Sequence, residues 1–382
     1  MKHTLHRQAQ TETFLLGQAQ APQWDKAAEQ CLQQIGYVPA EASLGFLYVT
    51  DVFADLLDEI VDHFREETGI RHWVGTVGMG ICGTGKEYYQ SGAITALIAS
   101  VPEDHFRILP SLRDGLAPLA ELAPWAAHAV PRLGVIHGDP SNSATPQLIE
   151  ALTRHWPDIY LVGGLSSSEG RFPQIADRIL EGGISGVLFS EQVPIVTGLS
   201  QGCTPIADKH TITRCERNVL VTLDDRPALD VFYEDIGEIL ARDLNRVAGY
   251  IFAGLPISNS DTGDYLVRNL VGVDTNNKLL AIGDTVTEGQ TLQFCRRDGA
   301  TAWEDLDRML ADLRTRVGTR PIRGGLYYSC LGRGQNLFGP DSDELRAIRK
   351  ELGDFPLVGF FANGEIFNGR LYGYTGVLTL FL

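Results

Sequence analysis

Short apolar runs that end in glycine-rich polar turns recur along the chain. The final part of the sequence contains three of them, at 324–334, 356–366 and 371–378. Such a run is typical of a buried strand whose exit turn needs positive φ or lets the backbone approach a ligand closely. We therefore look for a site at the ends of these runs.

The same order of runs occurs three times, which predicts a repeated strand–helix–strand–strand unit. The first strands are predicted at 45–51, 134–139 and 325–330, and the helices at 52–68, 145–155 and 342–353. In the first helix the apolar residues recur at helical spacing. Thr145 followed by Pro146 predicts the start of the second helix, with the Thr145 hydroxyl group as its cap.

A fourth, degenerate copy is predicted from Ala228, with a helix over 231–245 and strands at 249–254 and 265–272. Alternating polar and apolar residues predict a hairpin over 211–224, and an edge hairpin made of 278–286 and 290–295. The expected fold class is α/β (α+β). It consists of two similar domains of repeated units, with mixed or antiparallel sheets covered by helices, and it allows α/β/β/α layers.

Length and charge narrow the class of protein. A chain of 382 residues favours two domains, which we place at 1–223 and 224–382. The net charge of −16 argues against a nucleic-acid partner. No apolar run approaches the roughly 18 to 20 residues of a membrane helix, so we expect a cytoplasmic protein. The six scattered cysteines form no C-x-x-C pair, which argues against a zinc or disulfide framework.

The strongest candidate chemistry follows the strand at 325–330. Arg333 stands between two glycines, where its guanidinium group could bind a carboxylate or phosphate in bidentate fashion. The alternative is a structural salt bridge, with Glu365 as one partner. Together Arg333 and Glu365 could hold the two charged groups of an amino acid. We expect a pocket in which Arg333, Asn363 and Glu365 converge near Ser329 and Cys330.

Two further candidates lie in the second repeat. Ser166 and Ser167 follow a pair of glycines and could donate to a bound anion, or could satisfy the backbone of the turn. His137 lies near the carboxyl end of a predicted strand, where site residues of α/β sheets are found. Its alternative role is that of a hydrogen-bonded turn residue.

Two strings carry a family resemblance. Residues 329–334 (SCLGRG) and 359–366 (GFFANGEI) resemble motifs of the second domain of the FIST family, the F-box and intracellular signal transduction proteins. Residues 162–167 and 224–229 are similar to parts of its first domain. The resemblance covers nearly the whole chain. The sequence departs from the family's pattern at Leu331, at 367–368 and at Tyr372, where the family often has asparagine, glycine-proline and histidine.

The resemblance implies a sensory protein, bacterial or eukaryotic, that binds a small ligand such as an amino acid or small carboxylate. We take a bacterial protein as the expectation. Some bacterial members are described as haem-binding nitric oxide sensors that act on histidine kinases, which would give haem as cofactor and a histidine kinase or other signalling protein as partner. A haem sensor needs an axial ligand, and His137 is the candidate by elimination. The departure at Tyr372 puts any ligand that depends on that histidine in doubt.

The sequence leaves two classes of function open. The first is a ligand-binding sensor without catalysis, which we favour because no complete catalytic set is visible. The second is an enzyme with Cys330 as nucleophile and His137 as base, since both close the first strand of their repeat.

Overall fold

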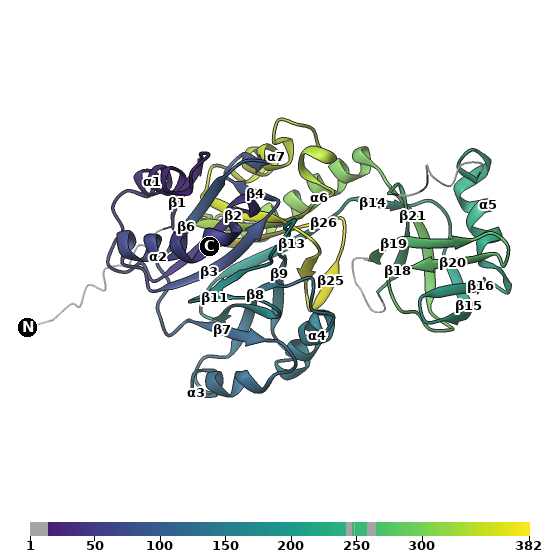
Figure 1. Ribbon diagram of the computed structural model, residues 1–382, viewed down its shortest axis with the longest axis horizontal. Coiled ribbons are helices and arrows are strands. Elements are labelled where there is room, and N and C mark those ends of the chain that lie inside the picture. Colours follow the sequence, from purple (N-terminus) through teal and green to yellow (C-terminus); the bar gives the residue numbers. More distant parts are fainter. Residues whose placement is uncertain (1–13, 242–246, 248, 258–264) are drawn as a thin grey trace, which may run out of the picture. The chain divides into compact units, whose positions relative to one another are not determined.

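A computed structural model of the protein describes residues 14–241, 247, 249–257 and 265–382 (Figure 1). It has two compact units. Unit 1 comprises the described part of Met1–Leu199 with Leu310–Arg370 and Gly376–Leu382, and unit 2 comprises that of Ser200–Met309 with Leu371–Thr375. The predicted boundary between residues 223 and 224 lies inside unit 2. Mixed sheets combined with helices confirm the predicted α+β fold class.

Three six-stranded sheets make up unit 1. In spatial order, the first sheet contains β1 (Phe14–Gln20), β6 (Ala93–Ala99), β2 (Leu44–Thr50), β3 (His72–Gly78), β10 (Gln174–Ala176) and β11 (Ile179–Leu180). The second contains β7 (Phe106–Leu112), β12 (Ile184–Ser190), β8 (Pro131–Gly138), β9 (Tyr160–Leu165), β24 (Glu365–Phe367) and β25 (Arg370–Tyr372). The third contains β13 (Ile195–Gln201), β26 (Thr375–Phe381), β22 (Gly324–Cys330), β23 (Leu357–Ala362), β4 (Gly80–Gly83) and β5 (Lys86–Tyr89).

One plan underlies all three sheets. The first strand of each repeat (β2, β8 or β22) pairs in parallel with the second (β3, β9 or β23) and antiparallel with the last (β6, β12 or β26). The strands after each second strand join another repeat: β4 pairs with β23, β10 with β3, and β24 with β9. The predicted threefold repeat is confirmed, and the repeats are interlocked by this cyclic exchange.

A repeated glycine shows why the three sequences share one pattern. In each second strand a glycine faces a residue of the first strand so closely that a Cβ atom would clash with a carbonyl oxygen. The pairs are Gly75 with Leu47, Gly163 with Ile136 and Gly359 with Tyr327, and the Cβ-to-oxygen distances would be 1.8, 1.9 and 1.7 Å. No other residue fits without moving a strand.

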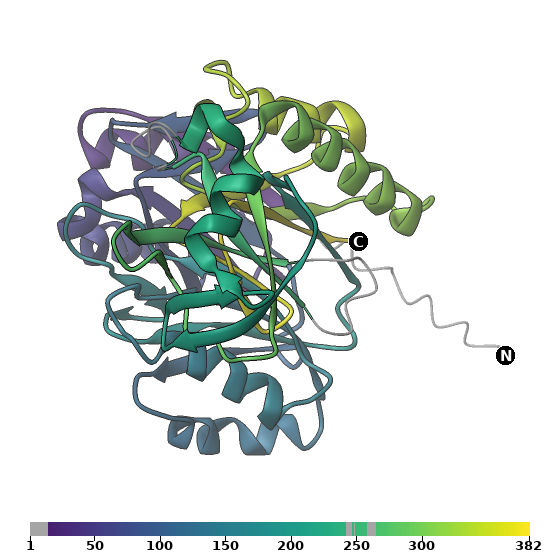
Figure 2. The same cartoon turned by 90° about the vertical axis from the view of Figure 1, so that its right-hand side faces the viewer.

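The three predicted helices of the repeats are confirmed as α2 (Leu57–Thr68, after a 3-10 turn over Asp51–Leu56), α4 (Thr145–His155) and α7 (Asp343–Leu352). Helix α1 (Trp24–Ile35) packs with α2 on the first sheet, as Figure 1 shows. The last turns of helix α6 (Gly299–Val317) lie beside α7 (Figure 2). Arg314 of α6 pairs with Glu351 of α7. The other helical segments in the described part of unit 1 are Ala117–Leu122, α3 (Ala123–Ala126) and Gly334–Asn336.

The predicted cap of α4 is wrong in detail. Ala144 occupies the capping position, and Thr145 is already inside the helix. The Thr145 hydroxyl group donates to the carbonyl oxygen of Asp139 at 3.2 Å. Pro146 does lie in the first turn, where a missing N–H group costs no hydrogen bond.

Unit 2 is built from antiparallel strands with helix α5 (Ala228–Ala241). In spatial order the strands are β14 (Cys203–Pro205), β21 (Thr291–Arg297), β15 (His210–Glu216), β16 (Val219–Leu223), β20 (Leu279–Ile282), β19 (Tyr265–Asp274) and β18 (Ile251–Pro256). The short β17 (Arg226–Pro227) pairs with β16. Because β18 also pairs with β21, the sheet closes on itself. Side chains from the strands and α5 form an apolar core, and a smaller apolar cluster lies between β14, β18, β19 and β21.

Two predictions for this unit have different outcomes. The hairpin over 211–224 is confirmed as β15 and β16. The edge hairpin of 278–295 is wrong, because β20 pairs with β16 and β19, and β21 pairs with β14, β15 and β18. The fourth copy also departs from the repeat, since β18 and β19 are antiparallel neighbours. The predicted helical residues 242–245 lie outside the described residues.

Candidate functional site

The predicted pocket residues of the third repeat lie at the carboxyl ends of two parallel strands. Ser329 and Cys330 are the last residues of β22, and Cys330 is in register with Ala362, the last residue of β23. Asn363 follows at once and is exposed. Parallel pairing therefore places these ends at one edge of the third sheet.

Arg333 is bound to an acid that the sequence analysis did not single out. Its side chain and that of Glu344, from the first turn of α7, are both fully buried. The Nε and one terminal nitrogen of Arg333 donate to Glu344 Oε1 at 2.9 and 2.7 Å. The Tyr327 hydroxyl group donates to the same oxygen at 2.6 Å, while the Ser329 hydroxyl group and the Gly334 N–H group donate to Oε2, each at 3.1 Å.

This arrangement satisfies the Glu344 carboxylate completely, with five donors on two oxygens. Burial alone would lower the pKa of Arg333, but the neighbouring Glu344 carboxylate outweighs it and raises the pKa. The guanidinium group also lies 4.9 Å from the ring centroid of Phe338. The salt bridge expected as the alternative for Arg333 therefore exists, with Glu344 as a partner.

A second acid comes from the exchanged hairpin of the first repeat. Glu87 on β5 is 9% exposed, and its Oε2 accepts from the Gln335 N–H group at 3.1 Å. The Tyr89 hydroxyl group lies near this carboxyl group, but neither it nor Glu87 Oε1 has a hydrogen bond of normal geometry within the described residues. Burial and the Glu344 charge raise the pKa of Glu87 to about 8. Its carboxyl group is therefore mostly protonated at neutral pH.

Tyr89 lies at the same edge as Glu87. Its hydroxyl oxygen would be 2.1 Å from a Cβ atom at Gly334, and its ring centroid is 4.7 Å from that of Phe361. Gly334 thus lets Tyr89 approach the end of β22. Nothing in the third repeat itself could have indicated Glu87 or Tyr89, because only the exchange of hairpins brings them here.

The predicted serines support turns and link repeats. The Ser166 hydroxyl oxygen is 2.6 Å from that of Thr76. Ser167 donates to the carbonyl oxygen of Phe361 and accepts from the Met79 N–H group at 3.0 Å. Both serines are buried.

Asn363 and Glu365 meet the same part of the second repeat as these serines. The Asn363 N–H group donates to the carbonyl oxygen of Leu165 at 3.0 Å. The buried Glu365 lies in register with Gly164 across β24 and β9. The backbone segment that contains Ser166 and Ser167 therefore lies next to the segment that contains Asn363 and Glu365.

His137 lies where the three repeats meet. It is fully buried, and its Nε2 is 3.1 Å from the Tyr48 hydroxyl oxygen, which is 3.0 Å from that of Tyr328. Tyr48, His137 and Tyr328 occupy equivalent positions, each directly after the residue that faces the repeated glycine. Burial lowers the pKa of His137 to about 3, so the ring is neutral. Its Nδ1 has no hydrogen-bond partner within the described residues.

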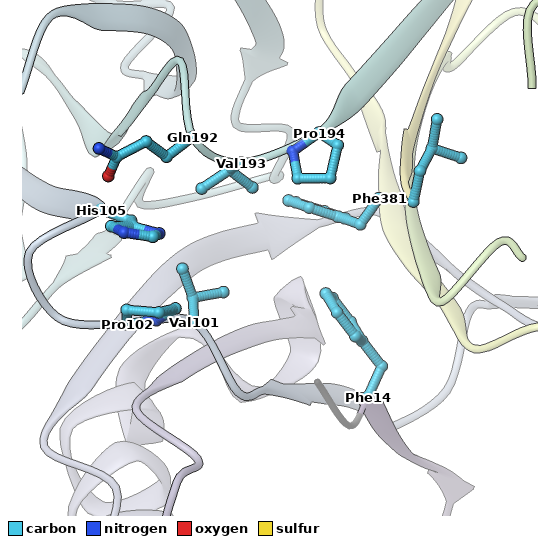
Figure 3. Close-up of a pocket in the computed structure, with 9 residues that line it drawn as sticks. Phe14, Val101, Pro102, His105, Gln192, Val193, Pro194 and Phe381 are labelled. Carbon is cyan, nitrogen blue, oxygen red and sulfur yellow. The ribbon is translucent and has the colours of Figure 1, made fainter. Parts of the chain in front are cut away.

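A separate, mainly apolar hollow lies between the start of β1 and the end of β26 (Figure 3). The rings of Phe14 and Phe381 face each other there, with centroids 5.2 Å apart. Polar side chains come from His105 and Gln192, at the end of the hollow away from Phe381. None of the predicted site residues lines this hollow.

Other features of the described chain bear on the class of site. The six cysteines, which all lie in the described ranges, form no disulfide bond. Within the described ranges, no three His, Cys, Asp or Glu side chains are grouped so that they could hold a metal ion. None of the helices in these ranges has the length and apolar character needed to span a bilayer.

The chain matches known proteins along most of its length. Residues 43–226 match the FIST N domain and residues 228–368 the FIST C domain. An uncharacterised protein of Mycobacterium tuberculosis is 30% identical over 325 residues, which span 81% of this chain and 83% of that protein. An uncharacterised protein of Mycobacterium bovis is 31% identical over 258 residues, 64% of this chain and 66% of that protein. The chain therefore belongs to the FIST family, whose domains serve sensing and signal transduction.

Proposed function

We propose that this protein is a sensor that binds a small amino acid or carboxylate at the carboxyl ends of β22 and β23. The observation that carries the proposal is the Glu87 carboxyl group, which is largely buried and has one oxygen without a hydrogen bond of normal geometry. Buried polar atoms are normally satisfied, and the exceptions gather at functional sites. Ser329, Cys330, Asn363 and Glu365 lie around the same strand ends.

The pairing of Arg333 with Glu344 changes the role proposed for Arg333. Its guanidinium group binds Glu344 and so fixes the loop after β22. In this role Arg333 positions the site and does not bind a ligand carboxylate directly. The protonated Glu87 carboxyl group can donate to a ligand carboxylate, and the ionised form can hold an ammonium group. The two roles have opposite pH dependence, because only the second strengthens as Glu87 loses its proton.

Thermal-shift screening of amino acids and small carboxylates against the wild type and Glu87→Leu, whose side chain can neither donate nor accept a hydrogen bond, tests the proposal. A ligand at 100 times its dissociation constant should stabilise the wild type by about 2.7 kcal/mol and the variant by less. Exposed Glu169→Leu is the matched control. Equal stabilisation of wild type and Glu87→Leu would remove Glu87 from the site, and no stabilisation by any compound would oppose this class of ligand.

The haem alternative places His137 as the axial ligand. The His137 ring lies 5.5 to 6.2 Å, between centroids, from the rings of Tyr48, Tyr328 and Phe360. These rings leave no room for a porphyrin beside it, so the residues as they stand do not fit the group. Haem binding would require this cluster to open. A hemin titration that gives the same spectrum with wild type and His137→Ala would exclude the role.

The enzyme alternative pairs Cys330 with His137. Register makes His137 equivalent to Tyr328, whereas Cys330 is equivalent to Asp139. The lowered pKa makes His137 a poor base at neutral pH. Alkylation of Cys330 with an ordinary thiol pH profile would argue against this alternative.

A histidine kinase as signalling partner stays a proposal from the family resemblance. Its test is to measure kinase autophosphorylation with and without the liganded protein.

A further inference from the structure

His210 lies between two carboxylate groups in unit 2. Its Nδ1 is 2.6 Å from Asp224 Oδ2, and its Nε2 is 2.9 Å from Asp235 Oδ2. The three side chains come from different places: the first residue of β15, the turn between β16 and β17, and helix α5. The Asp224 carboxylate also accepts from the Thr211 N–H group at 2.8 Å. The imidazole ring therefore links β15 to this part of α5.

The number of protons in this cluster decides whether it can hold together. A neutral imidazole ring has one N–H group, so it can donate to one carboxylate and turns a lone pair toward the other. Two contacts need two protons, which are present either with the imidazolium ion or with a neutral ring and a protonated Asp235. Removal of the second proton leaves Nε2 and Oδ2 as two acceptors 2.9 Å apart.

The surroundings favour retention of the second proton. Burial alone would lower the pKa of His210, but the hydrogen bonds to Asp224 and Asp235 outweigh it and raise the pKa. Burial also raises the pKa of Asp235, and Asp208 and Glu234 add to the negative charge around it. Arg226 is the cation near Asp224, and it is paired with Glu234. The neighbouring face of β21 presents the apolar ring of Phe294.

We propose that His210, Asp224 and Asp235 form a proton-dependent clamp that holds α5 against β15 and opens at alkaline pH. Asp235 lies two residues before Gly237, where α5 departs from helical geometry with φ of 76°. The clamp therefore fastens the last regular turn before this kink. The proposal does not depend on the ligand site proposed above.

The sign of the pH effect follows from the raised pKa of His210. Its stabilisation is fully present below the unfolded value of about 6.5 and is lost as pH rises through the folded value. Asp224 is bound through its backbone contact to Thr211 and through His210, which lower its pKa and keep it ionised throughout this range.

Hydrogen exchange of the full chain between pH 6 and 10 tests the clamp, with Asp235→Asn as the decisive variant. The asparagine amide can donate to Nε2 of a neutral ring, so it keeps the contact without a titratable proton. The ratio of wild-type to variant exchange rates for amides of β15 and α5 should rise by about tenfold per pH unit between the unfolded pKa of about 6.5 and the raised pKa of folded His210, and should level off above it. Exposed His128→Gln is the control and should follow the wild type.

A second measurement, made on the wild type, tests the proposal even if Asp235→Asn does not fold. Imidazole nitrogen NMR of the wild type should show that both ring nitrogens of His210 stay in hydrogen bonds that contain a proton well above pH 6.5. A His210 ring with one proton at pH 6.5, beside an ionised Asp235, would overturn the proposal. So would a rate ratio that does not change with pH.

Discussion

Two ion clusters of this protein use the same chemistry in different surroundings. In unit 1, Arg333 and Glu344 are both fully buried, and the carboxylate accepts from five donors. In unit 2, the His210 side chain is 15% exposed and that of Asp224 is 46% exposed. A buried arginine cannot lose its proton, whereas a partly exposed histidine exchanges its proton with water. The first cluster therefore fixes a loop permanently, and the second can respond to pH.

The largest effect is expected from Arg333→Ala. It leaves the Glu344 charge buried without its cation, which should destabilise unit 1 by about 3 to 5 kcal/mol. The control is Arg346→Ala, which removes an exposed pair with Asp343 and should change little. Urea unfolding followed by near-UV circular dichroism measures both variants. A loss no larger for Arg333→Ala than for Arg346→Ala would show that the cluster does not stabilise the fold.

A smaller effect is expected from Tyr327→Phe. This change removes one of the five donors but leaves the Arg333 cation in place, so the cost should be about 1 to 3 kcal/mol. Tyr37→Phe is the matched control because Tyr37 is 85% exposed. The same unfolding measurement applies, and equal midpoints for both variants would mean that the Tyr327 hydroxyl group is dispensable.

The difference between the clusters also explains what the sequence could predict. Local patterns sufficed for the repeats, since Gly75, Gly163 and Gly359 each mark a close approach to a neighbouring strand. They also sufficed for the helices, whose apolar spacing is local. The pairing of β20 and β21 was predicted wrongly because alternation identifies strands without identifying their neighbours.

The candidate site was predictable only in part, for a related reason. Ser329, Cys330 and Arg333 follow one another in sequence, so one motif revealed them. Glu344 was within reach of the sequence, because it lies in the first turn of the helix after the Arg333 loop. Glu87 was not, since its place beside Gln335 depends on the exchange of the β4–β5 hairpin between repeats. Non-local exchange leaves no pattern in either segment alone.

The smallest effect at pH 5 is expected from Glu87→Gln, which asks whether an acid beside the closed Arg333–Glu344 pair behaves like the titrating cluster of unit 2. Because the pKa of Glu87 is raised to about 8, the folded state holds a proton that the unfolded chain releases near pH 4.5. Wild-type stability should therefore fall as pH rises from about 4.5 to 8, and the variant should lack this slope. At pH 5 the two proteins should unfold at nearly the same urea concentration, and at pH 9 the variant should be the more stable. Parallel pH profiles would mean that Glu87 is ionised in the folded protein, with a cation beside it.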